Sequence, residues 1–279
     1  MLTVIASMDY EVSELRKKLR SVASVGGGQR SDPGAQSNLA DLKVIGVGKE
    51  RAQTSVRRLL ENRASGEPDS LLLLGVAGAV DPILRTGDLV LSSHYIESTE
   101  SRDFLQLNVT NDAKKKSLTP DSLMWELATT AFAGEGQKPF YMDSLTVGQV
   151  VSAPEQKKSI AGAYHVGIVE MEDYWVAEVA AEFGVAFLSA RVVLDTADQA
   201  LPGWLLGLSH SRSKAVLSLV GRPWRIPPVM RLARQRPVAQ KALTRFALRF
   251  LAEAANANKM PQTLINAGDD SQNGLKVSA

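Results

Sequence analysis

The stretch Val169-Glu170-Met171-Glu172, together with Asp195 further along the chain, decides the fold. Apolar runs at residues 164–169 and 185–194 flank a helix-like stretch at residues 173–183, which predicts a strand–helix–strand unit. We expect the acids that end these two strands to meet near one edge of a single sheet. Two carboxylates in one cleft suit acid–base work on a polar substrate. The alternative is a pair of solvated loop acids, and the spacing leaves both readings open.

Length and composition indicate one α/β domain. A chain of 279 residues with 44% hydrophobic content can bury one large core. Strand-like and helix-like stretches alternate without an obvious linker from residue 2 to residue 194. We expect a single domain over residues 1–256 that carries a basic, apolar insertion at about 199–236. The polar residues 257–279 are predicted to form a disordered tail.

The composition also excludes several classes of site. The chain has no cysteine, so it has no disulfide, no thiolate metal site and no cysteine nucleophile. Its histidines, His94, His165 and His210, are too scattered along the sequence to favour a zinc site. The apolar residues 2–6 are too short for a signal-peptide core, and no run approaches the roughly 18–20 residues that span a bilayer. We therefore predict a cytoplasmic protein with no metal and no cofactor.

Charge is distributed unevenly along the chain, although the net charge is only +2. The stretch 199–252 contains no Asp or Glu and ten basic residues: Arg212, Lys214, Arg222, Arg225, Arg231, Arg234, Arg236, Lys241, Arg245 and Arg249. An acidic body that carries a strongly basic segment favours an anionic partner. No nucleic-acid-binding motif accompanies these charges, so nucleic acid is not predicted as the partner.

Glycine-rich turns follow two of the predicted strands. Residues 70–76 form a continuous apolar run, typical of a central strand, which leads into Gly75-Val76-Ala77-Gly78. A strand-like stretch at 42–47 leads into Gly46-Val47-Gly48-Lys49. Such glycines let the backbone approach a ligand and expose its N–H groups, although ordinary turn chemistry is the alternative. The Gly- and Ser-rich residues 24–38 are predicted to form an exposed hairpin loop.

Taken in order, these segments resemble the purine nucleoside phosphorylase and nucleosidase superfamily, and most closely its methylthioadenosine/S-adenosylhomocysteine nucleosidase branch. The resemblance implies an α/β, three-layer α-β-α fold with a central mixed, partly barrel-like sheet. It covers roughly residues 1–198 through five segments: Ala6-Ser7-Met8-Asp9-Tyr10-Glu11-Val12, Gly46-Val47-Gly48-Lys49, Gly75-Val76-Ala77-Gly78 with Gly87-Asp88-Leu89-Val90, Val169-Glu170-Met171-Glu172, and Arg191-Val192-Val193-Leu194-Asp195-Thr196-Ala197-Asp198.

The resemblance implies a catalytic role for two carboxylates and a ribose-binding role for the sequence around a third. Asp195 would be the general acid at the purine N7, and Glu11 would activate the attacking water. Glu172 would accept hydrogen bonds from the ribose hydroxyls, with Met171 packed below the sugar. Arg191 would pair with a nearby acid to hold the geometry, or form a plain surface ion pair.

Apolar and backbone groups would complete the site that the resemblance implies. Val151 and Ser152 fall in the region whose backbone reads the base edge. Val76, Ala77 and Gly78 would line the pocket of the nucleophile. The resemblance therefore implies a purine nucleoside N-glycosidase that acts on an adenosine-type nucleoside.

Water is favoured over phosphate as the nucleophile. The loop before Glu11 is acidic, and Val76 stands where a phosphate site needs a hydroxyl residue. Arg51 or Arg85 could still supply a cation from a neighbouring subunit, so a phosphate-dependent phosphorylase remains an alternative. Leu194, before the predicted acid, departs from the serine of the nucleosidases, and a non-catalytic binding protein for a nucleoside or lipid nucleoside is the third reading.

The insertion at about 199–236 mixes tryptophan and leucine with arginine, which is typical of a membrane-surface segment. A lid or an oligomer interface is the alternative, and we expect a homodimer or larger homo-oligomer. Trp204 and Leu205 lie where relatives place a loop over the substrate, so they are candidate lid residues. This part also resembles, more loosely, hopanoid-associated members of the superfamily, which would imply an adenosyl-lipid substrate.

Overall fold

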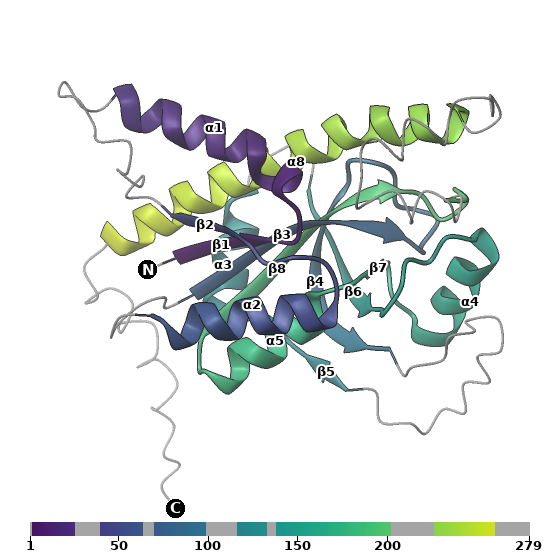
Figure 1. The fold of residues 1–279 in the computed structure, drawn as a ribbon, viewed down its shortest axis with the longest axis horizontal. Coiled ribbons are helices and arrows are strands. Elements are labelled where there is room, and N and C mark those ends of the chain that lie inside the picture. The colour runs from purple at the N-terminus through teal and green to yellow at the C-terminus, as the bar shows by residue number, and fades with distance from the viewer. Residues whose placement is uncertain are drawn as a thin grey trace, which may run out of the picture.

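The computed structural model describes residues 2–25, 40–63, 70–98, 116–132, 138–201 and 226–259. Figure 1 shows the elements in chain order: β1 (Leu2–Ala6), α1 (Asp9–Val25), β2 (Asp41–Val44), α2 (Lys49–Glu61), β3 (Ser70–Ala79), β4 (Leu89–Glu97), β5 (Ser117–Leu118), α3 (Ser122–Thr130), β6 (Phe140–Thr146), α4 (Pro154–Tyr164), β7 (Ile168–Glu170), α5 (Asp173–Glu182), β8 (Ala186–Asp195) and α8 (Ile226–Lys259).

The strands form one mixed sheet that closes on itself in part. Its order is β2-β1-β3-β7-β6-β4-β5, and β8 pairs with both β3 and β4. The strands β3, β7, β6, β4 and β8 therefore form a closed ring, while β1 and β2 extend the sheet beyond β3 in parallel. This arrangement confirms the predicted mixed, partly barrel-like sheet.

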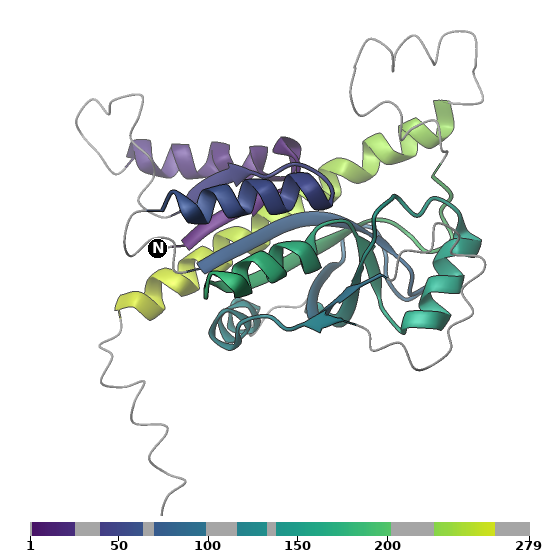
Figure 2. The same cartoon turned by 60° about the horizontal axis from the view of Figure 1, so that its bottom comes forward.

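Helices cover both faces of the extended sheet because the central strand β3 is apolar on both sides. Leu72 and Leu74 pack under α1 and α8, whereas Leu71 and Leu73 pack against the cluster that α2 and α5 bury. Figures 1 and 2 show α1 and α8 on one side of the sheet and α2 with α5 on the other. The three-layer α-β-α architecture predicted from the sequence is thus confirmed.

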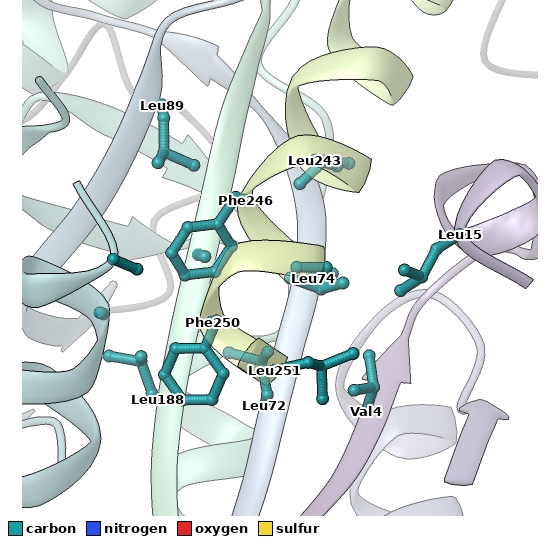
Figure 3. Close-up of a cluster of buried hydrophobic side chains, with 14 of the residues drawn as sticks. Val4, Leu15, Leu72, Leu74, Leu89, Leu188, Leu243, Phe246, Phe250 and Leu251 are labelled. Atoms are coloured by element: carbon teal, nitrogen blue, oxygen red, sulfur yellow. The ribbon is translucent and has the colours of Figure 1, made fainter. Parts of the chain in front are cut away.

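The larger cluster ties the end of the described chain to its start. Figure 3 shows Phe246 and Phe250 of α8 beside Leu188 of β8 and Leu72 of β3, with Leu15 of α1 nearby. Leu243 and Phe246 are fully buried. Burial of each such side chain contributes about 1.5–3 kcal/mol, so α8 belongs to the core rather than to an appended tail.

The strand–helix–strand prediction is right in outline and wrong in two details. Tyr164 is the last residue of α4, and His165 follows in the left-handed region with φ 56°, so the first strand is only Ile168–Glu170. In addition, β7 pairs antiparallel to β3 while β8 pairs parallel to it. The two strands therefore run in opposite directions and meet through their shared neighbour, not as a parallel pair.

Other element bounds also differ from the predictions. The strand predicted at 42–47 is β2, which ends at Val44. The terminal helix α8 begins at Ile226, so its first turns fall within the insertion predicted at about 199–236. The domain and tail bounds stay predictions.

Several predictions concern residues outside the described ranges. These include most of the loop at 24–38, the centre of the insertion, and the candidate lid residues Trp204 and Leu205. Within the described ranges, none of the helices combines the length and the apolar character that crossing a membrane requires.

Candidate active site

Glu11 is fixed at the junction of α1 and β3. Its side chain is 1% exposed, and its two carboxylate oxygens accept hydrogen bonds from two backbone amides. The Met8 N–H donates to Oε2 at 2.8 Å, and the Val76 N–H donates to Oε1 at 3.1 Å. The first turn of a helix suits a carboxylate because its N–H groups are unpaired there. The contact joins Glu11 to the glycine-rich end of β3, where Val76, Ala77 and Gly78 lie.

Glu172 lies at the start of α5 and faces the second glycine turn. Its Oε1 accepts a hydrogen bond from the Gly48 N–H at 3.1 Å, and its Oε2 lies 3.3 Å from Nη2 of Arg191. Gly48 has φ 87°, a conformation that side chains other than glycine rarely adopt. The glycine turn therefore serves to present a backbone donor to this carboxylate.

Arg191 is the centre of a buried ion cluster. Its side chain is 1% exposed, and Nη2 lies 2.9 Å from Glu170 and 2.6 Å from Asp173, in addition to Glu172. Gly75 makes room for it, since a Cβ at that position would lie 2.0 Å from Nη1 of Arg191. Of the two interpretations from the sequence, the partner of nearby acids is confirmed and the surface ion pair is wrong.

Two further acids of the cluster, Glu170 and Asp173, form hydrogen bonds around the turn that carries Glu172. Glu170 Oε2 accepts hydrogen bonds from the N–H groups of Glu172 at 2.6 Å and Asp173 at 2.7 Å, and Thr146 donates to its other oxygen. Asp173 accepts from Ser189 at 2.6 Å and from Arg191. These bonds fix the turn that carries Glu172, so the ribose-binding candidate is held by a rigid polar network.

The electrostatics of the cluster shift several pKa values. Burial raises the pKa of Glu11 to about 7, against the opposing effect of Arg191 and two backbone amides, and Glu172 adds to the rise. Burial and then Asp173 raise the pKa of Glu170 well above its usual value. Burial would lower the pKa of Arg191, but the three surrounding carboxylates raise it. A carboxylate with a pKa near 7 suits a general base at neutral pH.

Asp195 lies at the end of β8 and faces the same strand as Glu11. It pairs with Gly78, and a Cβ on that glycine would lie 3.1 Å from Oδ2 of Asp195. Burial raises the pKa of Asp195, although Lys157 opposes the rise. Glu11 contacts Val76, two residues earlier, and two residues of a strand span about 7 Å. The Val76–Gly78 segment therefore lies between the predicted base and the predicted acid.

The apolar candidates fall in different clusters: Val151 and Met171 share one, whereas Val76 and Ala77 belong to two others. Val151 is buried in a cluster with Val147 and Val169, and Met171 packs against that cluster. The carbonyl of Ser152 accepts a hydrogen bond from the Leu201 N–H at 2.8 Å, which ties the loop before α4 to the segment after β8. The candidates for the base and the sugar thus share one cluster.

Sequence reasoning missed Lys157, whose ammonium lies 2.5 Å from Oδ2 of Asp195. Lys157 follows Pro154 on α4 in a run of polar residues that is typical of a solvated helix, so no local signal marks it. Sequence reasoning also missed Asp173, which lies 2.6 Å from Arg191. Glu170 was quoted within its motif without a role.

The sequence matches the phosphorylase superfamily over residues 2–218, so the chain belongs to this family. Among curated relatives, it is 27% identical to a 5'-methylthioadenosine/S-adenosylhomocysteine nucleosidase of Maridesulfovibrio salexigens, over 69% of this chain and 84% of that protein. It is 25% identical to the enzyme of the same description from Staphylococcus aureus, over 80% of this chain and 100% of that protein.

Solved structures share the fold at lower identity. The 5'-methylthioadenosine/S-adenosylhomocysteine nucleosidase of Neisseria meningitidis, in complex with methylthio-immucillin-A, aligns with a TM-score of 0.62 and 16% identity over 91% of this chain and 98% of that chain. The futalosine hydrolase of Helicobacter pylori aligns with a TM-score of 0.60 and 15% identity over 88% and 96%, respectively. These structural similarities confirm the fold.

Proposed function

We propose that the protein is a purine nucleoside N-glycosidase, which cleaves the N-glycosidic bond of an adenosine-type nucleoside with water. The observation that carries the proposal is the Glu11 carboxylate, buried against the Val76 amide with a pKa of about 7. The family and the nucleosidases among the relatives support an enzyme that cleaves such bonds. The choice of an adenosine-type nucleoside as the substrate is the more specific part of the proposal.

Each carboxylate has a distinct task in this mechanism. Glu11 takes a proton from the water that attacks C1′, and Glu172 binds the ribose hydroxyls and stabilises positive charge on the sugar. Asp195 delivers a proton to N7, so the base leaves with the electron pair of the broken bond. Met171 would pack below the sugar, and Val151 and Ser152 would contact the base.

Charge at the site favours water over phosphate. Phosphate needs free cationic or hydroxyl donors, yet Arg191 and Lys157 are already paired with buried carboxylates. The Val76 N–H, a possible oxyanion donor, is bound to Glu11. A phosphate in the Val76–Gly78 pocket would therefore lie beside the Glu11 carboxylate without a counter-charge from these residues. Water has no such penalty.

Adenine release is the direct test. The purified protein should release adenine from methylthioadenosine, S-adenosylhomocysteine or adenosine at a rate that inorganic phosphate does not change. Inosine tests the base, since a site built for adenine should release hypoxanthine more slowly. Turnover that requires phosphate would instead assign a phosphorylase. Release of no base from any of the four compounds would contradict the proposal for soluble nucleosides and favour a binding protein or a lipid-linked substrate.

We also propose a membrane-surface contact at the start of α8, which would make a cytoplasmic protein peripheral to the membrane. Met230 and Val238 are 47% and 49% exposed, and they line a hollow of about 630 Å³ with Arg231 and Arg234. Exposed apolar side chains beside arginines suit an anionic lipid surface. A lid or an interface of a homo-oligomer remains the alternative use of this segment.

Liposome binding tests this contact. The intact protein should co-sediment with vesicles rich in phosphatidylglycerol and not with vesicles of phosphatidylcholine alone. Reversal of two charges, Arg231→Glu with Arg234→Glu, should abolish sedimentation, since each basic residue near such a surface contributes about 1 kcal/mol. The matched control is Lys17→Glu with Lys18→Glu on exposed positions of α1. Equal loss of binding in both double variants would contradict a contact specific to α8.

A further inference from the structure

Lys157 is a fully buried lysine whose ammonium makes three contacts at the end of β8. Nζ lies 2.5 Å from Oδ2 of Asp195, 2.7 Å from the carbonyl of Thr196 and 3.2 Å from the carbonyl of Gln199. An ammonium has three N–H donors, so these three acceptors satisfy it completely. Its side chain is 0% exposed, whereas that of its neighbour Lys158 on the same helix is exposed.

Stabilisation of the fold does not by itself explain why Lys157 and Asp195 are buried as an ion pair. Removal of an ammonium and a carboxylate from water costs several kcal/mol per ion, and buried pairs can often be replaced by apolar residues without loss of stability. The two carbonyl contacts would fix the loop after β8 whether or not Asp195 were acidic. The contact with Asp195 is therefore the one that calls for a functional explanation.

The pairing also bears on how Asp195 can act as an acid. Lysine holds its proton more tightly than a carboxyl group in water, so an ion pair leaves the proton on Nζ and the Asp195 oxygens bare. A bare carboxylate cannot protonate N7. In a buried site, however, the charged and neutral forms of a lysine–carboxyl pair lie closer in energy, because burial penalises both ions.

We propose that Lys157 supplies the proton that Asp195 delivers to the leaving base. The inference rests on the function proposed above. One proton passes from Nζ to the Asp195 carboxylate, and one passes from that carboxyl group to N7 as the C1′–N9 bond breaks and its electron pair stays with the base. The water oxygen bonds to C1′ and gives a proton to Glu11. Solvent then reprotonates the Lys157 amine and removes the proton from Glu11, so the cycle balances.

Few other charges bear on this pair. The neighbouring strands contribute Gly78 of β3 and Val169 of β7, which do not titrate. On the loop after β8, Asp198 accepts a hydrogen bond from Thr196, which is the main reason that its pKa is lowered, and Arg231 of α8 and Lys157 lower it further. Within the ranges that the structure describes, the titration of Asp195 is therefore governed by burial and by Lys157.

Lys157 acts through Asp195, so it is a positioning residue, and its test needs a readout that a structural role would not move. Lys157→Met should lower kcat for adenine release by about 10²–10³-fold at alkaline pH, where an Asp195 that lacks Lys157 can no longer take its proton from solution. The deficit should shrink as the pH falls, because the buried Asp195 then takes its proton from solution. A deficit that is constant from about pH 5 to about pH 9 would overturn the inference. Lys158→Met is the matched control and should leave kcat unchanged.

A double variant keeps the inference testable if Lys157→Met alone fails to fold. Lys157→Met combined with Asp195→Asn leaves no unpaired buried charge, and it should be as active as Asp195→Asn alone, because Lys157 has no route to the base without Asp195. A further loss of tenfold or more, about 1.4 kcal/mol, would overturn the inference. A wild-type protein that releases no base would instead refute the proposed function, which keeps the two failures distinct.

Discussion

Glu11→Gln is expected to lower kcat for adenine release by about 10²–10⁴-fold while the protein stays folded. The wild-type carboxylate accepts one hydrogen bond from Met8 and one from Val76. A glutamine has one carbonyl oxygen and one amide group, so it can accept only one of these bonds and cannot take a proton from water. Glu14→Gln, on the same helix, is the matched control and should keep the wild-type rate.

The pH dependence gives Glu11 a separate signature. Because burial raises the pKa of Glu11 to about 7, and a general base works ionised, kcat/KM should rise with pH and reach half its plateau near pH 7. The same carboxyl binds its proton more tightly in the folded state than in the unfolded state, where the pKa is 4.5. Its contribution to stability is therefore present below about pH 4.5 and is lost as the pH rises towards 7.

The Glu11→Gln variant should lose both of these pH effects. Its residual rate should no longer rise through pH 7, and its midpoint of denaturant unfolding should depend less on pH between about 5 and about 7. A residual rate that still rises with a midpoint near pH 7 would assign the titration to another group. That result would remove Glu11 from the role of base.

The central strands could be predicted because their signal is local and redundant. β3 carries apolar residues on both faces, and its glycines stand where Arg191 and Asp195 approach the backbone. β8 is likewise buried along nearly its whole length, so its predicted bounds differ from the observed ones by one residue at each end. Burial on both faces leaves little freedom for another assignment.

The failures arise where tertiary contacts override local pattern. Tyr164 is apolar and precedes an apolar run, but it ends α4 and packs its ring into the cluster around Val151. The directions of β7 and β8 are set by how each pairs with β3, which no single segment records. Lys157 looks like a surface lysine in sequence, and only the approach of α4 to the end of β8 buries it. The family resemblance identifies the catalytic candidates from the sequence, but it does not identify the residues that hold them in place, such as Lys157.

Replacement of Arg191, the cation at the centre of the buried ion cluster, should cause a larger loss of stability than the other substitutions proposed for this protein. Arg191→Met is expected to lower the free energy of unfolding by about 3–5 kcal/mol at neutral pH, as for other broken buried ion pairs. The variant leaves Glu170, Glu172 and Asp173 buried without their shared counter-ion. Denaturant unfolding followed by circular dichroism measures the change.

The loss of unfolding free energy in Arg191→Met should depend on pH in a defined direction. Burial and Asp173 already raise the pKa of Glu170, and the loss of Arg191 removes the charge that opposes this rise, so Glu170 holds its proton still more tightly in the folded state. A group of this kind stabilises the fold below its unfolded pKa and loses that contribution as the pH rises. The deficit of Arg191→Met should therefore be largest above about pH 7 and smaller near pH 5.

Arg57→Met provides the surface control for this cluster. Arg57 lies 2.6 Å from Glu182, but both side chains are more than 40% exposed. Exposed pairs contribute about 0–1 kcal/mol, so this variant should unfold close to the wild-type midpoint at every pH. Equal losses in the two variants, or a loss in Arg191→Met that does not change with pH, would show that the buried cluster is not held by charge. The turn that carries Glu172 would then owe its position to the hydrogen bonds of Glu170 and to packing.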